Sequence, residues 1–173
     1  MLLALFIGLS GCVQPPATPA MPPVPTRLAL TDDSVNSATY TLDGKAVTLV
    51  NGEATVEAAP GSAEKVTTKY DLTQRGDING DDLDDAAAVL VQTGAGSGSF
   101  YYLAACIGAE GGCKGSNAIL LGDRVVIQSL SVSPGGIKVV FMDHKDGASL
   151  AEPPTETVTE SFVFNGTELV EQP

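Results

Sequence analysis

Two runs decide the fold of this chain: AAAVLVQ (residues 86–92) and SFYYLAACI (residues 99–107). Both are almost entirely apolar, and such runs are typical of strands that are covered on both faces. The glycines at positions 94, 96 and 98 indicate a flexible hairpin loop between the two runs. We therefore expect two strands, joined by this loop, with both faces buried.

The segments around these runs have the pattern of half-buried strands joined by tight turns. Val66, Thr68, Tyr70 and Leu72 alternate with polar residues, so we expect them on one face of a strand. Turn signals recur farther out: Asp-Gly at 43–44, Asn-Gly at 51–52, Pro-Gly-Gly at 134–136 and Asn-Gly at 165–166. The turn at 51–52 predicts a hairpin between strands at 46–50 and 53–58.

Helical periodicity is nearly absent. No long window shows the 3.6-residue period of a helix, and we expect at most one or two short helices, near residues 32–37 or 117–121. The sequence thus predicts a mainly β fold over residues 28–173. We expect a single antiparallel β domain, and the pattern leaves a sandwich, an open barrel and a meander as alternatives.

The composition excludes one class of partner. Twenty-one acidic residues against nine Lys and Arg give a net charge of −12 at pH 7. Such a chain repels phosphate groups, so we expect no nucleic-acid partner. The same charge gives no attraction to anionic lipid headgroups, so membrane attachment has to come from a lipid anchor.

The densest polar stretch is DINGDDLDD (residues 77–85). Oxygen-bearing groups recur along it at alternate positions, and Ca²⁺ prefers about six to eight oxygen ligands. We expect a structural calcium site that is formed by the side chains of Asp77, Asn79, Asp81 and Asp85 and by the backbone carbonyl of Leu83. The alternative is an acidic turn without metal, although five aspartates this close together repel one another.

The spacing of this loop resembles the calcium loops of EF-hand, dockerin and integrin-type FG-GAP sequences. Expected strands on both sides favour the FG-GAP type, because an EF-hand needs flanking helices and a Glu where Ala88 stands. Asp82 occupies the position that glycine usually holds, and aspartate tolerates the required positive φ. We therefore expect weaker calcium binding, with Mg²⁺ a poorer fit because of its strict octahedral geometry.

The start of the chain resembles a bacterial lipoprotein signal. An uncharged apolar run ends in Leu9-Ser10-Gly11-Cys12, which resembles the lipobox, although no Lys or Arg precedes the run. The missing basic residues suggest that the true start lies farther upstream. The resemblance implies a signal peptide at residues 1–11, with Cys12 carrying diacylglycerol and palmitate. Proline-rich residues 12–27 then form an extended tether. The alternative to a signal peptide is that the apolar run is a buried N-terminal strand and that its cysteine is there by chance.

The remaining cysteines agree with export. Cys106 and Cys113 lie close in the chain, and an oxidising compartment favours a disulfide between them, with two free thiols as the alternative.

The sequence signals for catalysis are weak. His144 lies beside carboxylates, but no G-x-S-x-G elbow accompanies it, so we predict that the protein is not an enzyme and has no catalytic residues.

Several segments together resemble a group of uncharacterised bacterial lipoproteins and exported proteins. They are GDINGD (76–81), DAA (85–87), GSGSFYYL (96–103) and LGDR (121–124), and the resemblance spans residues 40–164. It implies export and adds no mechanism.

We therefore expect a non-enzymatic cell-envelope lipoprotein with a binding or structural role. In a Gram-negative cell it would lie at the periplasmic face of the outer membrane, because Val13 rather than aspartate follows the anchor. Its partner would be an envelope protein or the cell wall. The alternatives are an envelope hydrolase that uses His144 and an inhibitor of an envelope enzyme that presents residues 108–112.

Overall fold

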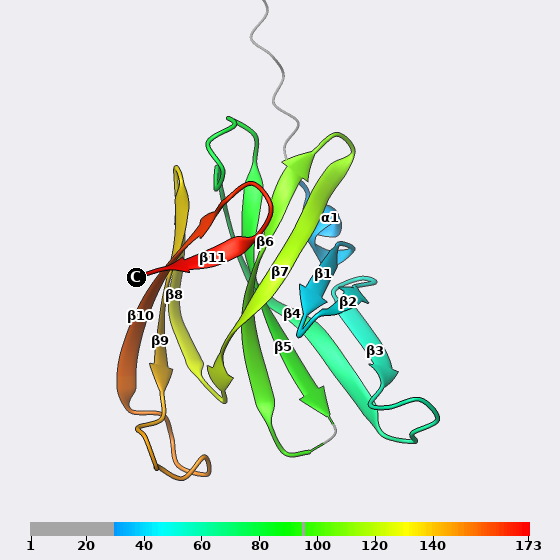
Figure 1. Ribbon diagram of the computed structural model, residues 1–173, viewed down its shortest axis with the longest axis vertical. Coiled ribbons are helices and arrows are strands. Elements are labelled where there is room, and N and C mark those ends of the chain that lie inside the picture. The colour runs from blue at the N-terminus through cyan, green and yellow to red at the C-terminus, as the bar shows by residue number, and fades with distance from the viewer. Residues whose placement is uncertain (1–29, 95) are drawn as a thin grey trace, which may run out of the picture.

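The computed structural model describes residues 30–94 and 96–173 and confirms the mainly β fold (Figure 1). The short helix α1 (Asp32–Asn36) confirms one of the two expected helical positions; the other, at 117–121, lies inside a strand. The strands are β1 (Thr39–Leu42), β2 (Lys45–Thr48), β3 (Glu53–Glu57), β4 (Lys65–Gly76), β5 (Asp85–Gly94), β6 (Ser99–Ala109), β7 (Gly112–Asp123), β8 (Val126–Ser133), β9 (Gly136–Asp143), β10 (Glu156–Phe164) and β11 (Leu169–Gln172).

The strands form two sheets. A seven-stranded sheet in the order β2-β1-β7-β6-β5-β4-β3 curls until it is nearly closed, and a four-stranded sheet in the order β11-β10-β9-β8 packs against its outer side. Strand pairs are antiparallel, apart from β1 and β7, which run parallel at Thr41 and Asn117. The domain therefore combines an open barrel with a sandwich, two of the expected alternatives.

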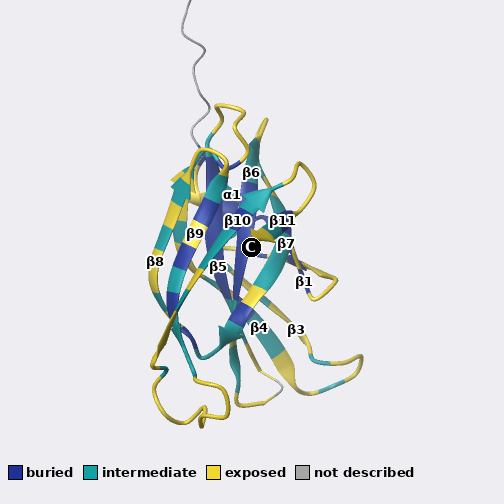
Figure 2. Ribbon diagram, turned by 60° about the vertical axis from the view of Figure 1, so that its left-hand side comes forward, coloured by how far each residue is buried: buried dark blue, intermediate teal, exposed yellow. Residues whose placement is uncertain are grey.

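Strands β5 and β6 are buried on both faces, as the two apolar runs predict. On β5, Ala88 and Leu90 lie in the core enclosed by the curled sheet, whereas Ala87 and Val89 lie in the core between the sheets. Figure 2 shows buried segments along the middle of the molecule and exposed residues at the loops. Alternate side chains of the same strand therefore pack in two different cores.

A β-bulge corrects the expected alternation on β4. Tyr70 pairs with Leu90, but Leu72 pairs with Val89, because the register shifts between Tyr70 and Leu72. The extra residue moves Leu72 to the opposite face from Tyr70, so the prediction that both share a face was wrong.

The structure bears on the predicted membrane attachment in two ways. The proposed signal peptide (1–11) and tether (12–27) lie outside the described residues. Within residues 30–94 and 96–173, no helix is long and apolar enough to cross a membrane.

The predicted hairpin at residues 51–52 forms its turn but does not continue as a pair of strands. Asn51 and Gly52 adopt the positive φ angles of 52° and 83°, and the flanking residues pair only at the single bridge between Val50 and Glu53. Beyond that bridge β2 pairs with β1 and β3 pairs with β4. The prediction of a continuous hairpin was wrong, and β2 and β3 become the two edges of the curled sheet.

Backbone hydrogen bonds explain why the two strands diverge. The Gly52 N–H donates to the Asn36 carbonyl at 2.8 Å, and the Tyr70 N–H donates to the Gly52 carbonyl at 2.8 Å. The turn is therefore held between the end of α1 and strand β4. A longer β2–β3 ladder would have to compete with the pairing that each strand already has.

A close approach of backbones holds the β1–β2 hairpin on β7. A Cβ atom added to Gly115 would fall against the Thr39 carbonyl oxygen and lie 2.8 Å from Tyr40 Cδ1. The buried Tyr40 hydroxyl donates to the Val35 carbonyl at 3.1 Å, which links the hairpin to α1. Only glycine at position 115 allows this approach without a shift of β1.

We expect Gly115→Ala to lower the free energy of unfolding by about 1–3 kcal/mol or more, because the added methyl group meets backbone that cannot easily move. Chemical denaturation measures this change. Gly136→Ala is the control: its Cβ would lie 3.1 Å from the nearest atom, the Phe162 carbonyl oxygen, and should cost less. Equal losses in the two variants would contradict the role assigned to Gly115.

Candidate functional site

A cleft of about 300 Å³ lies where the curled sheet fails to close, between the β1–β2 hairpin and strands β3 and β4. Its walls are mostly apolar, with side chains from both sides of the opening: Leu42, Val47, Ala54, Val56 and Val66. Val47 is buried, whereas Val56 remains 54% exposed. The mouth of an incompletely closed sheet, apolar with a few polar groups, is a common setting for a ligand site.

The polar groups of the cleft are already oriented by the protein. Thr68 is buried and accepts a hydrogen bond from Gln92 Nε2 at 3.3 Å. The Tyr102 hydroxyl donates to Asp43 Oδ2 at 2.8 Å. Burial and the Asp43 carboxylate raise the pKa of Tyr102 to about 12, so the hydroxyl stays protonated at neutral pH. These contacts fix the polar rim before any ligand arrives.

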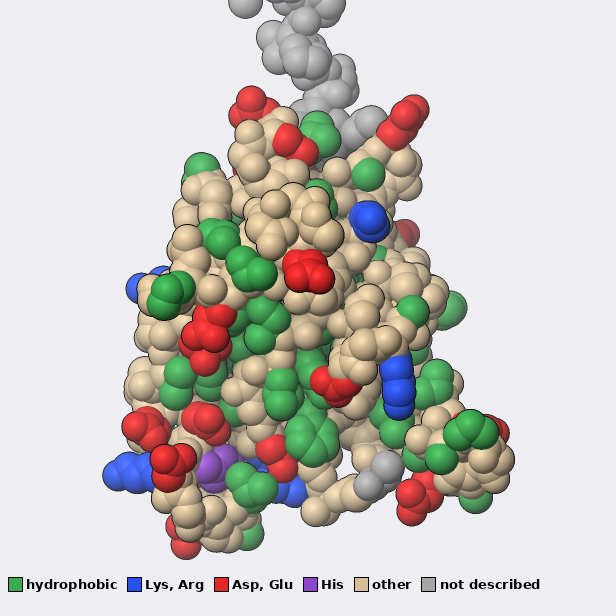
Figure 3. All heavy atoms as spheres, in the orientation of Figure 1, with side chains coloured by type: hydrophobic (Ala, Val, Ile, Leu, Met, Phe, Trp, Pro, Cys, Tyr) green, Lys and Arg blue, Asp and Glu red, His purple; other side chains and the backbone are tan. Residues whose placement is uncertain are grey.

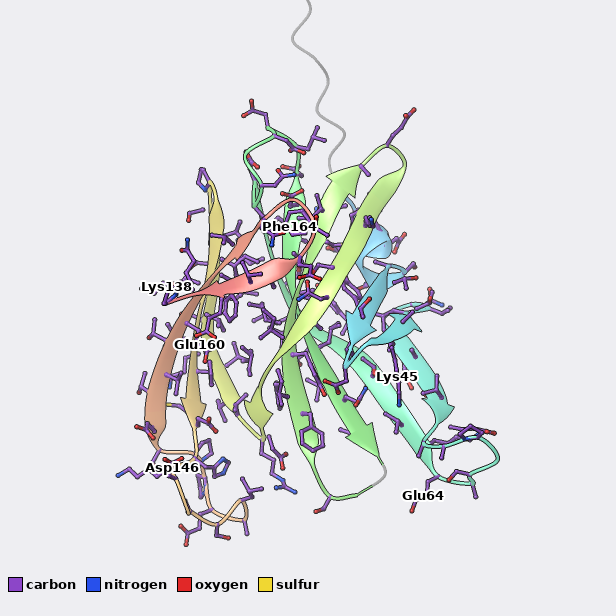
Figure 4. All side chains as sticks on the ribbon, in the orientation of Figure 1. Lys45, Glu64, Lys138, Asp146, Glu160 and Phe164 are labelled. Atoms are coloured by element: carbon purple, nitrogen blue, oxygen red, sulfur yellow. A yellow bond between two sulfur atoms is a disulfide. The ribbon has the colours of Figure 1, made fainter. Side chains whose placement is uncertain are left out.

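Lys45 is the cation of this cleft. Figure 4 shows it at the gap between the β1–β2 hairpin and strands β3 and β4. The rest of the surface is largely acidic, and Figure 3 shows few basic side chains on the face that it draws. Basic side chains are few in this chain, and Lys45 is one that lines the cleft.

No residue of the cleft was identified from the sequence as a ligand-binding residue. One signal was available: a two-residue turn at Asp43-Gly44 with strict alternation places Lys45 on the same face as Val47. That face could be identified as the wall of a cleft only after the failure of β2 and β3 to pair was known.

In the aspartate loop (residues 77–85), aspartate side chains accept hydrogen bonds from the loop's own backbone N–H groups. The Asp77 carboxylate accepts the backbone N–H groups of residues 80, 81 and 82 at 2.6, 3.2 and 3.2 Å. Asp81 accepts the Leu83 N–H at 2.8 Å and the side-chain amide of Asn79 at 2.9 Å. Asp82 adopts φ 64°, the left-handed conformation expected at this position.

Asp85 is turned into the protein. Its side chain is fully buried; Oδ2 accepts the N–H groups of Ile78 and Asn79 at 2.8 and 3.3 Å, and Oδ1 accepts that of Gly108 at 2.7 Å. Burial raises the pKa of the Asp85 carboxyl, and the three N–H donors oppose that shift by stabilising the charged form. Asp85 thus connects the aspartate loop with strand β6.

The side chains of the predicted calcium ligands Asp77, Asn79, Asp81 and Asp85 already accept hydrogen bonds from backbone N–H groups. Both oxygens of Asp85 are engaged by backbone N–H groups, and those of Asp77 face the loop's own amides. Within residues 30–94 and 96–173, no group of three or more His, Cys, Asp or Glu side chains is placed to hold a metal ion. Calcium binding by this loop stays a prediction from its sequence.

The His144 ring contacts the backbone of the connection between β9 and β10. Its side chain is 6% exposed, Nε2 lies 2.9 Å from the Glu152 carbonyl oxygen, and Nδ1 lies 3.8 Å from Asp143 Oδ1. In the part of the chain that the structure describes, Nδ1 has no hydrogen-bond partner and no serine hydroxyl bonds to the ring. The ring anchors the connection between β9 and β10.

The predicted disulfide between Cys106 and Cys113 is present, with a Cα–Cα distance of 5.4 Å. It crosses the β6–β7 hairpin, whose turn is formed by the exposed residues Glu110 and Gly111. The segment 108–112 is therefore a tight hairpin tip. Cys12, the proposed lipidation site, lies outside the described residues.

Comparisons of this chain with protein-family models, with curated proteins and with solved structures found no match. The resemblance to bacterial lipoproteins and exported proteins therefore stays an expectation.

We expect Asp85→Ala to lower the free energy of unfolding by about 3 kcal/mol or more, because three N–H groups lose their acceptor. Asp85→Asn keeps one acceptor oxygen and should cost less. Asp146→Ala, at an exposed position outside the loop, is the control. Denaturation is measured in millimolar Ca²⁺ and in chelator: equal losses in both support a purely structural Asp85. A loss that appears only with Ca²⁺ would make Asp85 a calcium ligand instead.

Proposed function

We propose that this protein is a non-enzymatic, exported lipoprotein of the cell envelope whose β domain binds a ligand in the cleft between β2 and β3. One observation supports the binding role above the others. Within the part of the chain that the structure describes, the two edges of the curled sheet are unpaired beyond the Val50–Glu53 bridge, and the side chains that would form a closed barrel core line an open cleft instead. An apolar wall with preset polar groups suits binding.

The proposed location depends on residues outside the described part of the chain. The lipobox-like sequence ending at Cys12 supports export and a lipid anchor, and the prolines that follow support a spacer between membrane and domain. The outer membrane, on its periplasmic side, remains the proposed site in a Gram-negative cell. A net charge of −12 disfavours nucleic acid as the partner.

The two alternative functions have less support. A hydrolase would need a serine hydroxyl on His144, and the ring instead contacts the Glu152 carbonyl. An inhibitor would need an exposed, rigid loop; residues 108–112 form a short hairpin tip beside the disulfide, and among the described residues no further contact of this tip supports that role over the cleft. A structural calcium ion is compatible with the proposal and is not needed for it.

Lipid attachment can be tested by expressing the full chain in a Gram-negative host with labelled palmitate. We expect the label on the wild-type protein and its loss in Cys12→Ala, because that thiol is the only proposed acceptor. The double variant Cys106→Ala/Cys113→Ala is the control and should keep the label. Labelled Cys12→Ala, or a wild-type chain that stays unlabelled after basic residues are placed before Leu2, would refute the anchor.

Ligand binding in the cleft can be tested with Nile red, an uncharged apolar dye, in the Cys12→Ala background and without detergent. We expect its fluorescence to rise on binding and Val56→Asp to weaken that binding at least about tenfold, since a charge would stand in the apolar wall. Val126→Asp is a matched control, because Val126 is 51% exposed on the other sheet and Val56 is 54% exposed. No dye binding, or equal effects of the two substitutions, would refute the cleft as a ligand site.

A further inference from the structure

The register of the β1–β2 hairpin turns Lys45 toward the concave side of the sheet. Lys45 is paired with Leu42, and Val47 is paired with Tyr40, across a two-residue turn at Asp43-Gly44. Residues directly opposite each other in an antiparallel pair share a face, and Leu42, Val47 and Tyr40 are all buried on the inner face. Lys45 therefore extends from an apolar wall, with its aliphatic stem beside Leu42 and Val47.

The other charged groups of the cleft already have partners. Glu57 Oε1 lies 3.4 Å from Lys65 Nζ, and Glu57 Oε2 accepts the Gly61 N–H at 2.9 Å. Asp43 accepts the Tyr102 hydroxyl. Within residues 30–94 and 96–173, Lys45 makes no hydrogen bond and no ion pair. Among the charged groups that the described residues bring to the cleft, its ammonium group is thus the one available to a ligand.

These observations specify the chemistry of the ligand, provided that the proposed function is right and the cleft is a ligand site. We propose that the cleft binds a single-chain amphiphile with an anionic head, such as a fatty acid, with the head on Lys45 and the chain along Val47, Val56 and Val66. The volume of about 300 Å³ is at the lower end of ligand pockets and favours one chain over two. A protein of net charge −12 repels anions elsewhere, so a local cation has to select the head.

An extended peptide is the other class of occupant that an open sheet edge could take. It could pair with the free edges of β2 and β3 and close the sheet. The edges offer only short strands, Lys45–Thr48 and Glu53–Glu57, and the charged side chains of β3 are already paired with Lys65 and Lys69. An unpaired ammonium beside an apolar wall has no role in that mode, so the amphiphile fits better.

The test compares laurate with lauryl alcohol, which has the same chain and no charge, as competitors for Nile red. For the unlipidated full chain we expect laurate to bind more tightly than the alcohol. Lys45→Met should weaken laurate about fivefold and leave the alcohol unchanged, because only the ionic contact is removed. Lys45→Arg should keep the affinity for laurate. Lys138→Met, on the exposed face of the second sheet, should change neither competitor.

The outcomes separate this proposal from the one on which it depends. If Nile red binds and laurate fails to displace it, the amphiphile is refuted while the cleft stands, and a peptide strand becomes the occupant to test. Equal losses of laurate and alcohol in Lys45→Met would also refute the ionic contact. If Lys45→Met does not fold, as judged by thermal unfolding, Lys45→Gln replaces it and has to show the same loss for laurate alone.

Discussion

The burial of β5 and β6 on both faces is the constraint on which the other elements depend. A strand that is covered on two sides needs a core on each side, so the seven-stranded sheet has to curl around one core and a second sheet has to cover the other. Small side chains at Ala87, Ala88, Ala104 and Ala105 let these layers approach closely. The buried Asp85 at the start of β5 links that strand to β6 through the Gly108 N–H, and the disulfide near the end of β6 links β6 to β7.

The curling of the sheet also accounts for the candidate site. Seven strands bring β2 and β3 near each other without pairing them, because the turn at residues 51–52 is held by α1 and β4. Apolar side chains that would be core in a closed barrel, such as Val56, remain partly exposed. The proposed binding role and the proposed role of Lys45 both follow from this incomplete closure.

Much of the fold could be predicted from sequence, because the signals are local. Periodicity identified the apolar strands, the turn signals at 43–44, 134–136 and 165–166 identified hairpins, and one of the two expected helical positions, residues 32–37, holds a short helix. Errors arose where pairing depends on distant residues. The bulge before Leu72 and the divergence of β2 from β3 leave no mark in their own segments. The aspartate loop shows the same limit, since its spacing could not reveal that Asp85 accepts the Gly108 N–H.

The sequence by itself determined the β class, the doubly buried central strands, the cysteine pair and the acidic charge, because each depends on composition, period or residue spacing. It also supplied the lipobox-like start. Tertiary structure alone decided which strands become edges, where the cleft lies, and that Asp85 faces inward while Lys45 has no partner among residues 30–94 and 96–173. The physical reason is that strand neighbours and burial are set by contacts between segments that are far apart in the chain, and a local pattern does not encode them.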